Sequence, residues 1–192
     1  MEPRPCARCP RLAAGQGNLR SGGERQVSMR ASREAEYTEY VHARLSWLRR
    51  TAYLLCQDWQ GADDLAQKTI TRLYTHWGRA GKAASLDAYV RGILVKAFLD
   101  ERRSAWARRV TLPGDYAERP AAGHDADIRL DVRAALRSLP PRQRATVVLR
   151  YYCDCPVEEA AKILGVTPGT VKSQTAKGLT ALRLALAPVM EA

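Results

Sequence analysis

The sequence lacks the features that would assign it to a catalytic class. Only three His residues are present (His42, His76 and His124), and they are widely scattered. It contains no glycine-rich phosphate loop, and no Ser or Cys stands in a nucleophile-elbow pattern. These absences argue against an enzyme, and we expect neither a cofactor nor a small-molecule substrate.

Long apolar runs are also missing. No run approaches the roughly 18 residues that a membrane-spanning helix needs. The N-terminus lacks the apolar core of a signal peptide. We therefore expect a cytoplasmic protein with no insertion into a membrane.

Cysteines are few and odd in number, five in all, which argues against a disulfide framework. Cys6 and Cys9 form a C-x-x-C, and Cys153 and Cys155 a C-x-C, so together they could supply four thiolates to zinc. The first pair lies in a stretch without periodic structure, so the expectation is that no metal is bound. Cys56 lies on an apolar helix face and is interpreted as a core residue.

Acidic residues are outnumbered. Lys and Arg total 31 against 20 Asp and Glu, giving a formal net charge of +11 and a pI of about 9.8. A basic protein of this kind has nucleic acid as the first partner to test. An RNA-binding or membrane-surface protein attracted by charge alone is the less specific alternative.

No strand alternation of any length occurs, and the apolar residues instead recur at helical spacing. The pattern predicts an all-α protein with two small helical domains joined by a flexible linker. Residues 1–31 are predicted to be a disordered basic tail, 32–109 the first domain, 110–126 the linker and 127–187 the second domain.

The strongest motif runs from Pro156 to Arg183 and predicts a helix-turn-helix. Gly165 stands where the turn needs a left-handed backbone, and Thr167 before Pro168 is a good N-cap. The second helix is basic and has no carboxylate up to Arg183. Such a motif places its second helix in the major groove of DNA.

A second basic stretch ends the third predicted helix of the first domain. Trp106 stands among the cations of this stretch, a pattern that suits single-stranded nucleic acid because an unstacked base can stack on the ring. A solvated charged face with Trp106 in the core is the alternative. The cations are Lys96, Arg102, Arg103, Arg108 and Arg109.

Three stretches in order resemble one family. They are GADDLAQKTITRLYTHW (61–77), SLDAYVRGILVKAFLDERR (85–103) and LPPRQRATVVLRYYCDCPVEEAAKILGVTPGTVKSQTAKGLTALR (139–183). This set resembles the bacterial sigma factors of the extracytoplasmic-function class, which have only sigma domains 2 and 4. The resemblance covers about residues 34–186 and implies a promoter-specificity subunit of RNA polymerase, the polymerase itself performing catalysis. A conventional helix-turn-helix regulator of duplex DNA is the alternative.

The resemblance implies a role for each matching stretch. The acidic segment of the first stretch would bind the clamp helices of the polymerase beta-prime subunit, and the second domain the beta flap. The segment 76–84 would capture a flipped base of the minus-ten element. An anti-sigma factor is also implied. The implied core-polymerase contacts are Asp63, Asp64, Leu65 and Gln67; the minus-ten contacts are Lys96, Arg102, Arg103, Trp106, Arg108 and Arg109; the minus-thirty-five contacts are Thr170, Lys172, Ser173, Gln174 and Lys177.

The sequence departs from the family pattern at several of these positions. Lys96 replaces a usual Asn, Gln174 and Lys177 stand where Arg is common, and Thr175 replaces a usual Leu. Gln prefers adenine edges and Arg prefers guanine, so we expect an upstream base preference different from the family norm.

Overall fold

The computed structural model describes the backbone of residues 20–111 and 127–190. Every regular element in these two ranges is helical, which confirms the predicted all-α class. Residues 41–192 form one compact unit, and the described residues before Val41 belong to the N-terminal part of the first helix.

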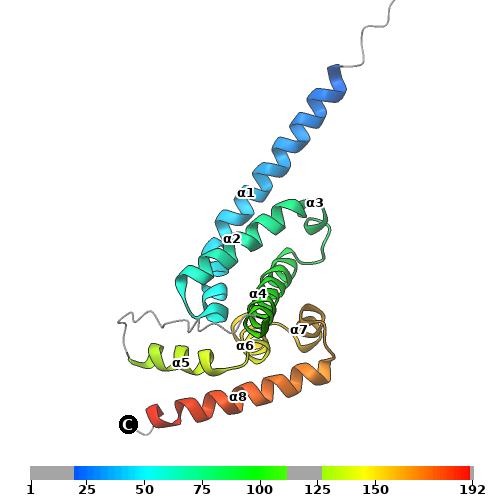
Figure 1. Cartoon of the computed structure of the whole chain (residues 1–192). Coiled ribbons are helices and arrows are strands. Elements are labelled where there is room, and N and C mark those ends of the chain that lie inside the picture. The colour runs from blue at the N-terminus through cyan, green and yellow to red at the C-terminus, as the bar shows by residue number, and fades with distance from the viewer. Residues whose placement is uncertain (1–19, 112–126, 191–192) are drawn as a thin grey trace, which may run out of the picture. The chain divides into compact units, whose positions relative to one another are not determined.

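The first set of helices, here called the N-terminal helices, consists of α1 (Arg20–Cys56), α2 (Trp59–Thr75), α3 (Trp77–Ala80) and α4 (Leu86–Thr111). The helix α2 packs against α4 (Figure 1). Fully buried side chains at the predicted apolar positions form the core. They are Leu55, Leu65, Leu73, Leu94 and Phe98.

Short polar side chains set where these helices begin. Gln57 has a positive φ of 64° and ends α1, and the Asp58 carboxylate then accepts a hydrogen bond of 2.6 Å from the Gly61 amide. Ser85 caps α4, since its Oγ accepts a 3.2 Å hydrogen bond from the Ala88 amide. Each cap satisfies an amide that has no partner inside its helix.

The prediction of a disordered tail over residues 1–31 is wrong for its last part, because α1 begins at Arg20. Adding residues to an existing helix costs far less than nucleating a new one. Residues 24–31 (ERQVSMRA) are mostly good helix formers, so the long helix extends backward through them. Residues 1–19 lie outside the described residues.

The second set, here called the C-terminal helices, consists of α5 (Asp127–Ser138), α6 (Pro141–Val147), the π-helical turn η1 (Val148–Tyr152), α7 (Val157–Leu164) and α8 (Pro168–Met190). The long helix α8 packs against α5, α6 and α7 (Figure 1). At Gly178 the helix lies close to α6, since an added Cβ there would be 2.7 Å from Val147 Cγ2. The glycine is therefore needed for space.

The two sets of helices are in contact within residues 41–192. The helix α4 packs on both α6 and α7. At the end of α1, Leu54 packs against a cluster formed by Leu136, Leu139 and Val147 from the C-terminal helices. The predicted linker, residues 110–126, has its first two residues in α4, and the rest lies outside the described residues.

Candidate nucleic-acid interface

The predicted helix-turn-helix forms from α7 and α8. Gly165 ends α7 with a φ of 65°, the left-handed conformation that the turn requires. Thr167 Oγ1 accepts a 3.2 Å hydrogen bond from the Thr170 amide and so caps α8. Ala160 and Val171 are fully buried between the two helices. The sequence-based expectation for this turn is confirmed.

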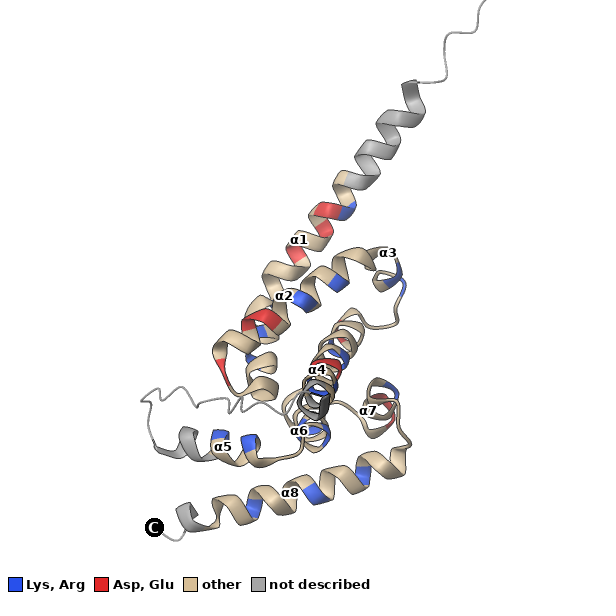
Figure 2. Cartoon of the chain, viewed as in Figure 1, with Lys and Arg blue, Asp and Glu red and all other residues tan. Residues whose placement is uncertain are grey.

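One side of α8 is exposed and basic. Lys172, Ser173 and Lys177 all point into solvent, as the helical spacing predicts. Figure 2 shows blue positions along α8 and no red ones, because the helix from Pro168 to Met190 contains no Asp or Glu. Such a surface attracts phosphates without a competing negative charge.

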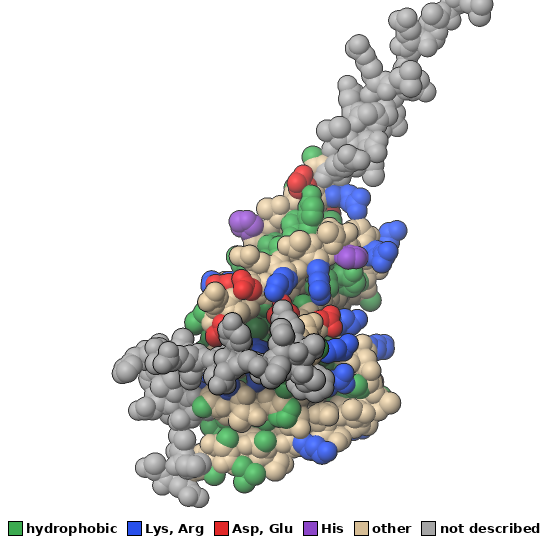
Figure 3. All heavy atoms as spheres, in the orientation of Figure 1, with side chains coloured by type: hydrophobic (Ala, Val, Ile, Leu, Met, Phe, Trp, Pro, Cys, Tyr) green, Lys and Arg blue, Asp and Glu red, His purple; other side chains and the backbone are tan. Residues whose placement is uncertain are grey.

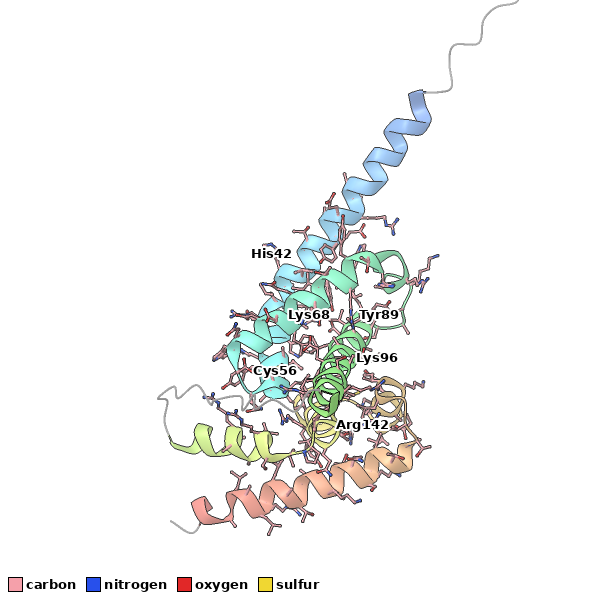
Figure 4. The ribbon with its side chains drawn as sticks, in the orientation of Figure 1. His42, Cys56, Lys68, Tyr89, Lys96 and Arg142 are labelled. Atoms are coloured by element: carbon pink, nitrogen blue, oxygen red, sulfur yellow. The ribbon has the colours of Figure 1, made fainter. Side chains whose placement is uncertain are left out.

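Two further predicted contacts of α8, Thr170 and Gln174, are only partly exposed. They line a small cavity of about 20 Å³ together with Leu99 of α4, Arg142 of α6 and side chains from the turn. Gln174 Oε1 is buried, and no described residue donates a hydrogen bond to it. Figure 4 shows Arg142 on α6 beside the end of α4. A buried amide oxygen without a partner costs about 1–3 kcal/mol.

The basic face of α4 carries the predicted minus-ten contacts. Lys96 and Arg103 are exposed, whereas Arg102 is half-buried with its guanidinium carbon 5.5 Å from the centroid of the Phe98 ring. Figure 3 shows basic side chains gathered on the side where α4 and α7 lie. The side chains of Trp106, Arg108 and Arg109 lie outside the described residues, so their predicted roles remain predictions.

The predicted acidic docking segment is at the start of α2. Asp64 and Gln67 are exposed, and Asp63 accepts two hydrogen bonds from the Arg49 guanidinium, at 2.6 and 3.0 Å. These bonds lower the pKa of Asp63. Asp64 is therefore the carboxylate of the segment that a partner can approach without displacing Arg49.

Leu65 requires a correction. Its side chain has no exposed surface and lies in the core of the N-terminal helices, so it makes no direct contact with a partner in this conformation. Residue i and residue i+1 of a helix point in different directions, so neighbours of an exposed carboxylate are often buried. Leu65 instead holds α2 in place beneath Asp64 and Gln67.

Sequence reasoning missed an aromatic stack beside the acidic segment. The rings of Tyr53 and Trp59 stack with centroids 4.2 Å apart, although Trp59 is 52% exposed. The Arg49 guanidinium lies over Trp59, and that of Arg133 over Tyr53, at 5.7 and 5.1 Å. No periodicity finds such a stack, because it joins α1, α2 and α5.

Arg144, on α6, was also missed and is nearly buried. Its guanidinium donates to the Leu55 carbonyl at 2.7 Å, the Arg137 carbonyl at 2.9 Å and the Leu139 carbonyl at 3.1 Å. These acceptors lie at or near the carboxyl ends of α1 and α5, where helix dipoles favour a cation. Burial lowers the pKa of Arg144 to about 10, which still leaves it charged at neutral pH.

The three described cysteines are free thiols. Burial raises the pKa of Cys56 and of Cys155 to about 12 and that of Cys153 to about 11. Among the described residues, no three His, Cys, Asp or Glu side chains are grouped so as to hold a metal. Cys6 and Cys9 of the zinc alternative lie outside that range.

Two family models match the chain, and both describe sigma factors. The model for Sigma-70 region 2 matches residues 40–108, and that for Sigma-70 region 4 matches residues 129–182. The RNA polymerase sigma-E factor of Streptomyces avermitilis is 33% identical over 152 residues, covering 77% of this chain and 83% of that protein. The chain belongs to the extracytoplasmic-function sigma factors of bacterial RNA polymerase.

Other relatives agree with this family. The ECF RNA polymerase sigma factor SigM of Mycobacterium tuberculosis is 29% identical over 177 residues, covering 91% of this sigma factor and 89% of that one. A solved structure of the sigma factor RpoE with the anti-sigma factor NepR, from Bartonella quintana, matches with a TM-score of 0.66 and 25% identity. The match covers 79% of this chain and 97% of that chain, and it agrees with two small helical domains.

The sigma factor directs promoter-specific transcription initiation, in which sigma factors bind core RNA polymerase and promoter DNA. The match to region 2 favours this function over a conventional helix-turn-helix regulator, because such a regulator accounts only for the C-terminal motif. The relatives are sigma factors, which are not enzymes. None of the helices in the described ranges is both long and apolar enough to cross a membrane.

Proposed function

We propose that this sigma factor binds its partners through three surfaces, one acidic and two basic. The acidic surface, formed by Asp63, Asp64 and Gln67 on α2, binds the clamp helices of the beta-prime subunit. The basic face of α4, with the segment 76–84, holds the melted minus-ten strand. The helix α8 reads the minus-thirty-five element, and the chain itself performs no catalysis.

One observation carries this proposal. In a chain with a net charge of +11, exposed Asp64 stands beside Asp63 at the start of α2, whereas α8 has no carboxylate at all. Charge of one sign repels partners of the same sign, so the acidic surface suits a protein and the basic ones suit DNA. The exposure of Lys96 and Arg103 on α4 supports the second basic surface.

The proposal includes the domain limits expected from the sequence: sigma domain 2 covers residues 32–109 and sigma domain 4 covers 127–187. Contact of the second domain with the beta flap is part of the same proposal, as is a cytoplasmic location with the polymerase. The solved relative was crystallised with an anti-sigma factor, which supports the proposal that an anti-sigma factor also regulates this chain.

The central test adds the purified protein to core polymerase on a genomic promoter library. Specific transcripts whose starts share two upstream elements are expected. If no transcript depends on the added protein, the proposal is refuted.

A docking test separates the acidic surface from general charge. Asp64→Lys is expected to weaken co-purification with core polymerase in the absence of DNA by at least about tenfold, as the loss of a central interface contact does. Glu158→Lys, at an exposed carboxylate on α7, makes the same change of charge and is the matched control. Equal loss in both variants would contradict a specific role of α2.

A promoter test separates base reading from phosphate contact on α8. Lys177→Ala is expected to weaken binding similarly on all promoters and to lower the salt dependence, because an exposed Lys contacts phosphate. Gln174→Arg is expected to shift the preferred upstream base from adenine toward guanine. An unaltered preference in that variant would exclude Gln174 as a base reader.

A further inference from the structure

An exposed indole lies beside the acidic surface of α2. Trp59 is the first residue of this helix and is 52% exposed. Its ring stacks on Tyr53 with centroids 4.2 Å apart, and the guanidinium carbon of Arg49 lies 5.7 Å from its centroid. The stack and the cation contact together order the indole. A side chain that is already ordered loses little conformational entropy when a partner covers it.

Helical spacing places Trp59 in line with the docking residues. Trp59, Asp63 and Gln67 recur at steps of four, so they follow one another along one side of α2, over about 12 Å at 1.5 Å per residue. Arg49 joins the first two, because its guanidinium donates to Asp63 and lies over Trp59. Asp64 is exposed beside this row, and Figure 2 shows acidic positions at the start of α2. The indole therefore extends the acidic surface to the first turn of the helix.

The charge around the indole favours a protein partner over DNA. Residues 58–64 (DWQGADD) contain three Asp and no Lys, Arg or His. The charge of Arg49 is paired with Asp63, and Arg133 brings a second guanidinium to the stack, so the carboxylates outnumber the cations. Phosphates are repelled by such a surface. A protein that offers a cation to the exposed carboxylate and an apolar gap to the ring matches both features, since Trp is enriched among the residues that dominate interface energies.

We propose that Trp59 is an aromatic anchor of the polymerase-docking surface. Its indole packs into an apolar gap between side chains of the clamp helix that meets Asp64, and Tyr53 and Arg49 order the ring for that contact. This inference rests on the proposed docking role of α2. It adds to that role an apolar contact that supplies affinity, whereas the carboxylate supplies orientation and a faster association rate.

Truncation of the indole tests this inference. Trp59→Ala in the full chain is expected to raise the Kd for core polymerase, measured without DNA, by about 5- to 30-fold, the range for an interface hot spot. Trp59→Phe keeps a ring that can stack on Tyr53, so its Kd is expected to stay within about threefold of wild type. A wild-type Kd for Trp59→Ala would overturn the inference. Equal losses in the two variants would also overturn it, because the ring face would then not be the anchor.

Tyr74→Ala is the matched control for these variants. Tyr74 lies near the other end of α2 and is 54% exposed, so this variant removes a similar aromatic surface from the same helix outside the acidic surface. Its Kd for core polymerase is expected to stay within about twofold of wild type, as for most surface contacts. If Tyr74→Ala weakens docking as much as Trp59→Ala does, the effect is not specific to Trp59 and the inference is refuted.

Salt separates the anchor from the carboxylate beside it. Because an apolar contact is not screened by ions, the fold-change caused by Trp59→Ala should be the same at about 0.1 M and about 0.5 M salt, whereas that of Asp64→Lys should shrink. If Asp64→Lys weakens docking but Trp59→Ala does not, the inference fails and the acidic surface stands. If only Trp59→Ala weakens docking, the anchor stands and the proposed role of Asp64 fails.

A labelled single-stranded oligonucleotide tests the nucleic-acid alternative. Trp59→Ala is expected to bind it with the wild-type Kd, measured by fluorescence anisotropy, because the surrounding carboxylates repel phosphates. If this variant instead loses affinity for the oligonucleotide and keeps the wild-type Kd for core polymerase, the ring contacts DNA and the inference is overturned.

Discussion

Two polar side chains of this sigma factor, Arg144 and Gln174, differ in the number of hydrogen bonds that their buried atoms make. Arg144 donates hydrogen bonds through its two terminal nitrogens to three backbone carbonyls near the ends of α1 and α5, and its Nε has no acceptor among the described residues. Gln174 has its amide oxygen buried, with no donor among the described residues. Helix α6 contributes to both places, since Arg142 and Thr146 line the cavity at Gln174. The three bonds of Arg144 stabilise the fold, whereas the Gln174 amide oxygen gains no hydrogen bond from its burial.

Removing the Arg144 guanidinium is expected to have the largest effect on stability. Arg144→Met keeps an apolar side chain of similar length but leaves the carbonyls of Leu55, Arg137 and Leu139 without this donor. Because an unpaired buried acceptor costs about 1–3 kcal/mol, the free energy of unfolding should fall by about 3 kcal/mol or more. Urea denaturation followed by circular dichroism measures the change.

The control for this variant is Arg142→Met, at an exposed position on the same helix. Its free energy of unfolding should stay within about 0.5 kcal/mol of wild type. Similar midpoints for the two variants would show that Arg144 contributes no more than a surface side chain.

A pair of glycine variants compares the packing of α8 with that of α4. Gly178→Ala is expected to lower the free energy of unfolding by about 1–3 kcal/mol, because its Cβ would lie 2.7 Å from Val147 Cγ2. Gly92→Ala, on α4, meets nothing within 4 Å and should stabilise the protein by about 0.5–1 kcal/mol. Thermal melting distinguishes them, and stabilisation by both would mean that α8 and α6 are packed loosely.

Removing the Gln174 amide should change stability less than removing the Arg144 guanidinium does, and it should alter promoter recognition. Gln174→Met replaces the buried Oε1 by an apolar group, so the free energy of unfolding should stay level or rise by up to about 1 kcal/mol. Sequence preference at the minus-thirty-five element should weaken, as measured by binding to a set of single-base variants. A marked loss of stability would show that the amide has a partner in solution.

Alkylation of the three described cysteines is expected to give the smallest effect. Because burial raises the pKa values of Cys56, Cys153 and Cys155 to about 12, 11 and 12, few thiolates exist at pH 7.5. Alkylation by iodoacetamide should be at least about tenfold slower at each of them in the folded protein than in urea, as read by mass spectrometry. The rates should rise only as the pH approaches 11. Fast labelling of Cys153 at neutral pH would contradict the raised pKa of its thiol.

Much of the secondary structure followed from residues close together in the sequence. Gly165 and Thr167 act through bonds or backbone angles within a few positions of themselves, so their roles were predicted and are confirmed. The start of α1 was predicted too late, because helix extension depends on a stable helix further along the chain. Leu65 was given to a partner because the family motif contains it, whereas burial depends on the packing of α2 against α4.

The sequence by itself determined the all-α class, the helix-turn-helix, the exposed basic side of α8 and the family, because periodicity, caps and motifs are local signals. Only the tertiary structure decided that Arg144 bridges two helix ends, that Arg91 meets Glu159 and that the Gln174 amide oxygen is buried beside a cavity that Leu99 also lines. Arg144 and Leu55 are 89 positions apart, and no local pattern encodes such a contact. Burial of a polar side chain is set by distant helices, so the availability of each reading residue is a property of the folded chain.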